Sequence, residues 1–507
     1  MLQFITNVNN TINGWVWGWP ALILLGFTGV LMTCLTKWFQ VSHFKYWISH
    51  TIGQIFGDKR VTQHTKDKTI SQFQSLCTAL AATVGTGNIV GVAGAIAVGG
   101  PGAVFWMWLI AFFGMMTNFS ENVLGILYRR KNEEGEWCGG AMYYLRDGLG
   151  SKKNCKTIGA VLAVLFSVFC LLASFGIGNM SQVNSMVKNV NHAFGIPNIV
   201  VGVFLFFAVS LVIIGGLKRV AAFTEKLVPF MVILYLIGTI VIICMNITMV
   251  PAIFVSIFKG AFAMKSAVGG IVGAGIAQAM KMGMKRGVFS NEAGLGSSVM
   301  VHSSSNVIEP VKQGMWGIFE VFADTIVVCT LTALTLLSGG CVDLATGQLT
   351  AAGEEVGSSA LMSYAFEQVF GKPGAMFVAI AILLFAYSTV LGWSHYGSKA
   401  FEYLFGTKAI FVYRVVFSAV VLAGSVMEAQ LAWDISDTFN GLMMIPNLIG
   451  VLVLSPQVMR CTKNYVDRRI RKQEDINPML SMFPDIQAEQ EVRLKERLAT
   501  LAANEDA

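Results

Sequence analysis

Residues 79–102 read ALAATVGTGNIVGVAGAIAVGGPG, and this stretch decides the fold. It is apolar enough to lie in a bilayer, yet glycine recurs in it at Gly85, Gly87, Gly91 and Gly94. Each glycine lowers helix stability by about 1 kcal/mol relative to alanine, so the pattern predicts a membrane helix that is interrupted near its middle. An interruption leaves backbone N–H and C=O groups that need partners, and an ion or a small zwitterion supplies them. A glycine-lined packing face between helices is the alternative.

The composition of the whole chain predicts a polytopic membrane protein. Of its 507 residues 54% are hydrophobic and 13% are charged, and the mean hydropathy is +0.63, whereas soluble domains carry roughly 25% charged residues. The net charge of +7 lies mostly in short loops between apolar spans, so it fits the positive-inside rule and we expect no nucleic-acid partner. The nine cysteines form no CxxC pair, which argues against a metal site or a disulfide framework. The first apolar segment lacks a basic region before it, so we expect no cleavable signal peptide.

Hydropathy and the basic loops together predict about eleven membrane-spanning helices. The loops 37–69 and 129–157 and the tail after Arg460 carry basic clusters, so we place them in the cytoplasm and the N-terminus outside. The protein is therefore expected to lie in the cell inner membrane, with the lipid bilayer as a partner, and its tail is expected to form an amphipathic helix near 485–502. The predicted spans are approximately 15–35, 70–98, 103–128, 158–188, 197–217, 221–246, 267–289, 312–338, 374–404, 409–427 and 437–457.

After the first span, the predicted helices form two blocks of five, and each block opens with a glycine-rich helix. In the second block the glycines are at 269, 270, 273 and 275. Because five is odd, the two blocks have opposite orientations, and glycine-broken helices at corresponding positions of inverted halves point to the binding site of a secondary transporter. The resulting division is 1–69 (N-terminal helix and cytoplasmic loop), 70–247 (first repeat), 248–263 (outer connection, with a short interfacial helix), 264–457 (second repeat) and 458–507 (cytoplasmic tail). Within the second repeat, 291–311 reads as a polar inner connection and 339–373 as an outer loop.

Several long motifs resemble those of the alanine or glycine:cation symporter family, the sodium:alanine symporters, within the amino-acid–polyamine–cation transporter superfamily. They are VGTGNIVG at 84–91, GGPGAVFWMWLIAFFG at 99–114, KRGVFSNEAGLGSS at 285–298 and FAYSTVLGWSHYG at 385–397. The resemblance covers about residues 15–460. It implies an all-α, leucine-transporter-like fold of five plus five inverted helices with one extra N-terminal helix. It also implies sodium-coupled uptake of a small neutral amino acid, namely alanine and possibly glycine.

The resemblance further implies roles for the first broken helix. Thr86 and Gly87 are expected to donate their backbone N–H groups to the substrate carboxylate. Two sodium positions are expected beside them, although a serine or threonine hydroxyl in a membrane helix also commonly bonds its own helix four residues back. The expected sodium ligands are the Thr83 carbonyl and the Asn88 side chain at one position, and the Ala81 and Val84 carbonyls with the Ser388 and Thr389 hydroxyls at the other.

Further substrate contacts are expected from two other helices. In the second broken helix we place the interruption at Gly273 and Gly275, with Gln278 one turn on. In span 158–188, Gln182 is placed to bond the polar groups of the substrate. Ordinary packing and bonds between helices are the alternatives for all four residues.

Ionisable residues inside the membrane are candidates for function. Asp324 lies near the middle of span 312–338, and we expect it to take part in cation or proton coupling or else in a structural bond. Glu121 is expected to make a structural bond. Lys399 and Glu402 lie near the end of their helix and are expected to snorkel toward the aqueous phase.

Three functional classes fit a membrane protein of this kind: a cation-coupled symporter, an uncoupled channel or facilitator, and an intramembrane enzyme. The spans carry no HExxH or GxSxG motif, which disfavours an enzyme, and a channel does not need inverted broken helices. The sequence therefore predicts a monomeric secondary transporter that carries sodium with its substrate. Proton coupling through Asp324 is one variant, and glutamine, D-alanine or serine as the substrate is another.

Overall fold

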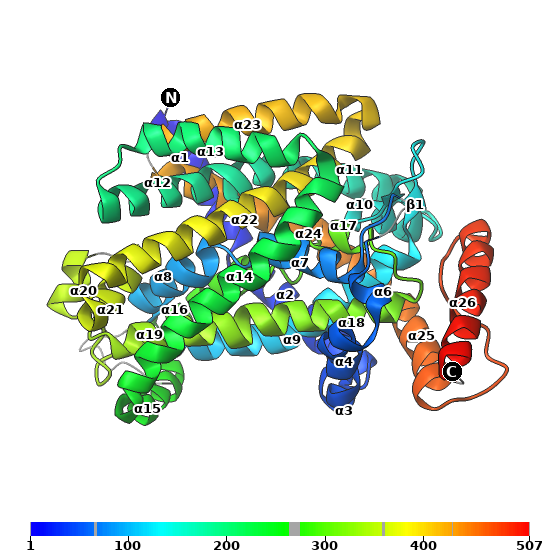
Figure 1. Ribbon diagram of the computed structural model, residues 1–507, viewed down its shortest axis with the longest axis horizontal. Helices are drawn as coiled ribbons and strands as arrows, with labels where there is room; N and C mark the ends of the chain where they lie inside the picture. Colours follow the sequence, from blue (N-terminus) through cyan, green and yellow to red (C-terminus); the bar gives the residue numbers. More distant parts are fainter. Residues whose placement is uncertain (1, 65–67, 263–273, 357–359, 428, 506–507) are drawn as a thin grey trace.

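The chain folds almost entirely into helices. The computed structural model describes residues 2–64, 68–262, 274–356, 360–427 and 429–505. Within these ranges the one sheet is an antiparallel hairpin of β1 (Arg130–Lys131) and β2 (Trp137–Cys138). Most of the long helices run broadly along the long axis of the molecule (Figure 1).

The N-terminal part and the first predicted repeat are built from long helices joined by short ones. α2 coincides with the predicted first span at 15–35, and α1 adds a helix before it that was not predicted. The segment 37–69 folds into four short helices rather than an open loop. The elements are α1 (Leu2–Val16), α2 (Trp19–Leu35), α3 (Phe39–Ser42), α4 (Phe44–His50), α5 (Ile52–Gly57), α6 (Lys59–Thr62), α7 (Gln72–Thr83), η1 (Gly87–Gly91), α8 (Val92–Gly99), α9 (Gly102–Leu127), α10 (Ala141–Tyr143), η2 (Tyr144–Leu149), α11 (Lys156–Phe175), η3 (Gly176–Met180), α12 (Ser181–Phe194), α13 (Asn198–Ile213) and α14 (Gly216–Met245).

The second predicted repeat has the same character, and the tail ends in one long helix. The expected helix in 248–263 is present as α15, and the expected amphipathic tail helix as α26. The elements are η4 (Ile247–Met249), α15 (Val250–Phe262), α16 (Ala274–Asn291), α17 (Val299–His302), α18 (Pro310–Val321), η5 (Phe322–Cys329), α19 (Thr330–Ser338), α20 (Ala351–Val356), α21 (Leu361–Phe370), α22 (Lys372–Phe405), η6 (Thr407–Ala409), α23 (Ile410–Val426), α24 (Ala429–Val453), α25 (Ser455–Tyr465), η7 (Val466–Ile470) and α26 (Pro484–Glu505).

Seven helices of the described chain are long and apolar enough to cross a bilayer, and two bent helix pairs bring the number to nine. Each of the nine coincides with one predicted span. The two predicted spans left over are α13, a shorter apolar helix of 16 residues, and 267–289, whose first residues lie outside the described ranges. The number of eleven therefore stays a prediction.

The glycine-rich stretch at 79–102 is interrupted, as its sequence predicts. α7 begins with a capping box in which Ser71 and Gln74 each accept a hydrogen bond from the other's backbone. The helix ends at Thr83, and its axis turns by 49° before Gly87–Gly99 continues the span. The interruption thus falls at residues 84–86, in the middle of the membrane helix.

The second broken helix differs from the prediction. α16 runs without a break from Ala274 to Asn291, so Gly275 lies inside a helix, whereas Gly273 lies outside the described residues and an interruption there stays a prediction. An interruption falls at 292–298, where Gly294 and Gly296 have φ values of +95° and +73°, which glycine adopts without strain.

The segment that follows this interruption is also part of the interior. Residues 290–305 are all buried, so the polar inner connection predicted for 291–311 is wrong as well. Its serine hydroxyls donate inside the protein, for example from Ser303 to the Val299 carbonyl and from Ser305 to Gln313. Polar side chains with internal partners of this kind are stable in a core.

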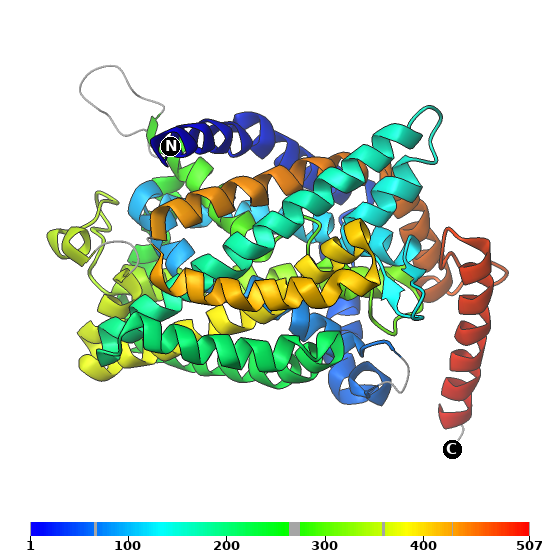
Figure 2. The same ribbon diagram turned by 90° about the horizontal axis from the view of Figure 1, so that it is seen from above.

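The two ends of the bundle carry different segments (Figures 1 and 2). The hairpin, α3–α6 and α26 gather at one end, which we call the tail end, and α15, α20 and α21 lie at the other. The segments predicted to be cytoplasmic therefore share one end, and the connections predicted to be outside share the other.

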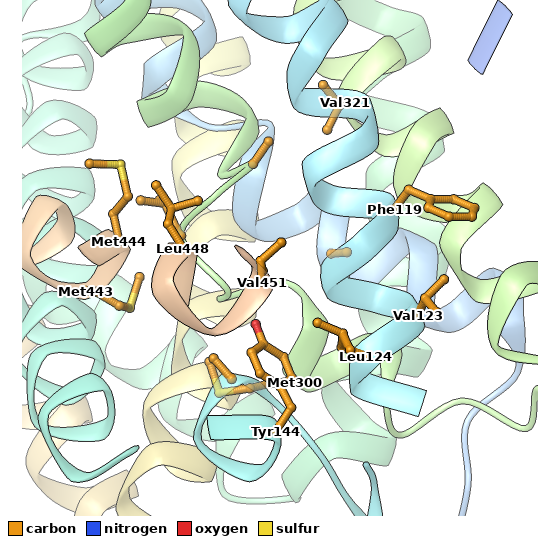
Figure 3. Close-up of a cluster of buried hydrophobic side chains, with 14 of the residues drawn as sticks. Phe119, Val123, Leu124, Tyr144, Met300, Val321, Met443, Met444, Leu448 and Val451 are labelled. Carbon is orange, nitrogen blue, oxygen red and sulfur yellow. The ribbon is translucent and has the colours of Figure 1, made fainter. Parts of the chain in front are cut away.

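The largest apolar cluster packs α9 and α24 around the short helix α17 (Figure 3). The side chains labelled in the figure come from five segments that are far apart in the sequence, and each of them is fully buried. This cluster fixes the inner half of the second broken helix against the first repeat. The side chains labelled in Figure 3 are Phe119, Val123, Leu124, Tyr144, Met300, Val321, Met443, Met444, Leu448 and Val451.

Candidate functional site

The Asn88 side chain stabilises the interruption of the first broken helix. The Gly85 N–H donates to Asn88 Oδ1 at 2.9 Å, and the Asn88 N–H donates to the Gly85 carbonyl at 3.2 Å. Thr83 lies at the end of α7, and its buried hydroxyl oxygen has no hydrogen-bond partner among the described residues. The break is therefore a buried, locally ordered turn with one unsatisfied polar atom, the Thr83 hydroxyl oxygen, beside it.

The helix α22 lies directly against this turn. Ser388 Oγ donates to the Phe385 carbonyl at 2.8 Å and lies 3.3 Å from the Ala81 carbonyl, and Thr389 Oγ1 donates to the Phe385 carbonyl at 3.0 Å. A Cβ atom on Gly85 would lie 2.3 Å from Thr389 Oγ1. The expected partners are thus brought together. The Thr389 hydroxyl makes the bond four residues back that was the alternative, and the Ser388 hydroxyl bonds its own helix three residues back. A hydroxyl that donates its hydrogen keeps its lone pairs for a cation.

Two of the residues expected to bind the substrate touch each other. Thr86 Oγ1 donates to Gln182 Oε1 at 2.9 Å, and the Thr86 N–H points at the same oxygen at 3.4 Å. Gln182 Nε2 donates to the Ile177 carbonyl at 3.0 Å, in the turn η3 that interrupts α11 and α12. On the other side, a Cβ on Gly87 would lie 3.2 Å from the ring of Phe289. The first break therefore lies between α12 and the end of α16.

Asp324 lies beside the same turn and is fully buried. Asn88 Nδ2 donates to Asp324 Oδ1 at 2.7 Å, while Ser290 and Thr325 donate to Oδ2 at 2.7 and 2.8 Å. Among the described residues, no Lys, Arg or His side chain comes within ion-pairing distance of this carboxylate, and no three His, Cys, Asp or Glu side chains gather as a transition-metal site requires. The carboxylate thus joins η1, α16 and η5 through neutral donors alone.

Two of the residues expected at the substrate site, Gly275 and Gln278, are not brought to it. Gly275 and Gln278 line a cavity of about 920 Å³ together with residues 98–102, at the end of the bundle opposite the tail. Ser290 lies against Gly87, at the break, and it is 15 residues after Gly275 and 12 residues after Gln278 in α16. At a rise of 1.5 Å per residue, Gly275 and Gln278 therefore lie about 22 and 18 Å from the break. Gly273 lies outside the described residues.

Two carboxylates hold the second break, Glu121, which the sequence indicated, and Glu292, which it did not. The Glu121 carboxylate accepts a bond from Asn447 and faces the backbone of Gly294 and Gly296, so it makes the structural bond expected of it. Glu292, inside the break, accepts from the Ser297 hydroxyl at 2.5 Å. In the sequence, this break is indicated by the two glycines of NEAGLG. Because acidic and polar residues surround these glycines, the segment resembles a loop.

A second set of missed residues fixes the chain after α17. His302 Nε2 lies 2.9 Å from Glu320 Oε2, and both side chains are fully buried. Arg129, at the end of α9, donates to the carbonyls of residues 303, 305 and 307 at 3.2, 2.9 and 2.6 Å. These bonds satisfy the backbone carbonyls at the end of the second broken helix, where a helix otherwise leaves them without partners.

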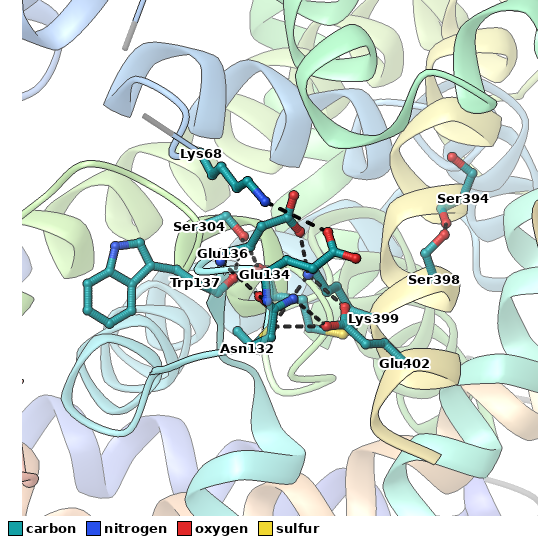
Figure 4. A network of polar contacts seen from close by, with 12 residues as sticks. Lys68, Asn132, Glu134, Glu136, Trp137, Ser304, Ser394, Ser398, Lys399 and Glu402 are labelled. Atoms are coloured by element: carbon teal, nitrogen blue, oxygen red, sulfur yellow. Dashed lines mark hydrogen bonds and ion pairs between the residues drawn. The ribbon is translucent and has the colours of Figure 1, made fainter. Parts of the chain in front are cut away.

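The hairpin covers the tail end of α22 (Figure 4). Lys399 Nζ lies 2.7 Å from Glu402, and Asn132 and Cys138 donate to the same carboxylate at 2.9 and 3.3 Å. Burial raises the pKa of the Cys138 thiol to about 11, so it stays a donor. The expectation that Lys399 and Glu402 snorkel to water is wrong, because the hairpin buries both of them to 7% exposure.

Comparison with known proteins agrees with this arrangement. The chain is 42% identical to the sodium/alanine symporter AgcS of Methanococcus maripaludis over 94% of its own length and 100% of the relative. It is 35% identical to the probable sodium/glutamine symporter GlnT of Bacillus subtilis over 92% of both chains, and 35% identical to the putative sodium/proton-dependent alanine carrier YrbD of the same organism, over 94% of this chain and 95% of that protein. These relatives are transporters, so the protein is an amino-acid transporter and not an enzyme.

The fold is likewise found among solved structures. The structure of MhsT in complex with L-phenylalanine matches with a TM-score of 0.51 at 12% identity, over 79% of this chain and 99% of that one. The predicted leucine-transporter-like fold is therefore confirmed. The family model for the sodium:alanine symporters matches residues 2–479, and with its broken helices and buried polar turn in place, the chain belongs to the sodium:alanine symporter family.

Proposed function

We propose that the protein imports a small neutral amino acid, alanine with glycine as the second candidate, together with sodium. The observation that carries this proposal is the contact between the break at residues 84–86 and α22. There the Ala81 carbonyl, Ser388 and Thr389 bring oxygen atoms of both proposed repeats together in a fully buried turn. Sodium is a hard cation that prefers such oxygen ligands over nitrogen or sulfur.

We assign one sodium position to the carbonyls of Ala81 and Val84 with the hydroxyls of Ser388 and Thr389. The unsatisfied Thr83 side chain beside this turn supports a cation there, because a buried oxygen without a partner is costly. The second position, with the Thr83 carbonyl and Asn88, is less directly supported. Asn88 Oδ1 already accepts the Gly85 N–H, although an amide oxygen has a further lone pair for an ion.

For the substrate we assign the N–H groups of Thr86 and Gly87 to its carboxylate, at the positive end of the half-helix that begins there. In the structure the Gln182 side-chain oxygen accepts from Thr86, at the position proposed for the substrate carboxylate. A substrate carboxylate that replaces it frees the Gln182 oxygen to accept from the ammonium group. The close approach of Phe289 to Gly87 leaves little room on that side, which favours a small side chain.

Proton coupling through Asp324 is the second candidate, and one observation favours it. The carboxylate is fully buried and bonded only by neutral donors, so it can accept a proton without losing an ion pair. An intramembrane carboxylate of this kind is by default a candidate for cation or proton work.

The proposed transport cycle uses the sidedness expected from the sequence, with the N-terminus outside and the tail in the cytoplasm of a multi-pass inner-membrane protein. In this cycle the two five-helix repeats rock relative to each other about the binding site. The repeats are 70–247 and 264–457, and the remaining segments are 1–69, 248–263 and 458–507. Since one chain supplies both broken helices, one copy suffices for transport. An inside-negative potential of 100 mV adds about 2.3 kcal/mol per sodium ion, which supports about fiftyfold accumulation.

The test is uptake of labelled L-alanine into proteoliposomes, with an inward sodium gradient compared with an equal potassium gradient at fixed pH and potential. We expect accumulation only with sodium, and competition by glycine in excess of that by glutamine. Gln182→Ala should abolish uptake, whereas Gln278→Ala, the matched control far from the break, should retain it. Sodium-independent accumulation that collapses without a proton gradient would transfer the coupling to Asp324.

A further inference from the structure

A basic cavity lies at the tail end of the molecule, far from the transport site. It has a volume of about 260 Å³ and is enclosed by α4, the start of α18, η7 and α26. Four cationic or imidazole side chains from these four elements line it, namely His50, Lys312, Arg469 and Arg497. The convergence of four separate segments on one cavity marks it as a distinct place in the fold.

The charges around this cavity do not balance. The carboxylate of Glu309 is engaged by Arg468 and Arg469 at 2.8 and 3.1 Å, and Arg497 pairs with Asp58 at 3.4 Å. Lys312 is left over, because no carboxylate in the described part of the chain lies within 4.0 Å of its ammonium group. Burial and the nearby Lys312 lower the pKa of His50, and its hydrogen bond to the Tyr46 carbonyl offsets them only in part.

The cavity also offers directed hydrogen-bond donors. The N-terminus of α18, a helix of 12 residues, lies at the cavity wall, where Ile308 and the N-cap Glu309 directly precede the helix, and a helix N-terminus attracts anions. The hydroxyl groups of Tyr46 and Tyr465, 3.1 Å apart, lie at its rim. Basic cavities beside membrane helices bind phosphorylated lipid headgroups through this combination.

We propose that this cavity binds a phosphate group, and the surrounding surface favours the headgroup of an anionic phospholipid as its source. On the short helices beside it, Val41, Phe44 and Phe56 are 53%, 45% and 89% exposed. Exposed apolar and aromatic side chains of this kind lie at the membrane interface, where they contact acyl chains. The bound headgroup joins α26 to the core, since Arg497 and Lys312 face it from either side.

The test is native mass spectrometry of the purified full chain with phosphatidylglycerol or phosphatidylcholine at equal concentration. We expect a phosphatidylglycerol adduct that is about fivefold weaker in Lys312→Gln, the effect of one lost cation. The matched control Lys463→Gln removes an exposed charge of α25 at the same end, and Lys312→Arg keeps the charge, so both should bind as the unmodified protein does.

A second arm separates the sources of phosphate. In nanodiscs of phosphatidylcholine, inorganic phosphate is compared with chloride at equal ionic strength by thermal unfolding. Stabilisation by phosphate that Lys312→Gln abolishes supports the site with a soluble anion as its ligand. Equal affinity for both lipids together with no effect of phosphate overturns the proposal, and so does a Lys312→Gln variant that behaves like Lys463→Gln.

Discussion

Replacing Gly85 by alanine tests the contact on which the proposed sodium site depends. The new Cβ would lie 2.3 Å from Thr389 Oγ1, 3.3 Å from Thr389 Cβ and 3.5 Å from Gln182 Oε1. The Thr389 hydroxyl must move, and it then gives up its bond to the Phe385 carbonyl. Overpacking of a core costs about 1–3 kcal/mol, and the lost hydrogen bond about 1 kcal/mol more. We therefore expect Gly85→Ala to be destabilised by about 2–4 kcal/mol, with a higher sodium midpoint for uptake.

The assay compares thermal unfolding and sodium-dependent uptake in a set of four variants. Thr389→Ala removes the clashing hydroxyl, so the double variant Gly85→Ala/Thr389→Ala should recover about 1–2 kcal/mol relative to additivity. Its sodium midpoint should stay high, because the proposed ligand is missing. The control is Gly94→Ala, where a Cβ meets no atom within 4 Å and alanine favours the helix, so stability should be unchanged or higher.

Three results would contradict this reasoning. If Gly85→Ala unfolds at the same temperature as Gly94→Ala, α22 does not press on the break as described. If the two substitutions are additive in the double variant, the loss of stability has another cause than the contact with Thr389. An unchanged sodium midpoint in Thr389→Ala would remove its hydroxyl from the ion site.

Three further predictions concern other groups. Asn88→Ala removes the acceptor of the Gly85 N–H and a donor to Asp324, so the sodium midpoint of uptake should rise several-fold, and an unchanged midpoint would exclude Asn88 from the ion site. Asp324→Asn should impair transport while the protein still inserts and elutes as a folded species; normal transport would leave Asp324 a structural role. Burial raises the pKa of Glu309, but Arg469, Lys312 and Arg468 outweigh it and hold that pKa below the usual 4.5. The contribution of Glu309 to tail docking is therefore full above pH 4.5 and lost as the pH falls through the lowered pKa, and protease cleavage of the tail should rise there but change little with pH in Glu309→Gln.

The sequence predicts the first broken helix well because its signal is local. Glycines at 85, 87 and 91 in a charge-free apolar stretch disfavour a continuous helix whatever surrounds them. The contact of Ser388 and Thr389 with this break joins segments about 300 residues apart, and only the resemblance to a known family indicated it. In the absence of that resemblance, nothing in the period or composition of α22 distinguishes these two hydroxyls from others in membrane helices.

The second break could not be placed in this way, because what stabilises it comes from elsewhere in the chain. The polarity of residues 290–305 is typical of a loop. Their burial depends on Glu121 in α9, Arg129 just after α9 and Asn447 in α24. Of the glycines predicted to interrupt this helix, only Gly275 lies in the described residues, and it is inside α16. Glycine content predicts where a helix is easily interrupted, whereas the position of the partners decides where the interruption occurs.

The buried polar segment 290–305 has a consequence for how the protein is made. A stretch that reads SNEAGLGSSVMVHSSS cannot partition from the translocon into lipid by itself, because each charged or strongly polar residue opposes insertion. It reaches the bilayer interior only against partners that are already there, such as Glu121 and Arg129, which are synthesised earlier. Asn447 arrives last and closes the assembly. Insertion of the second half thus depends on side chains of the first half. We therefore expect substitutions in α9 to impair membrane insertion as often as they impair transport.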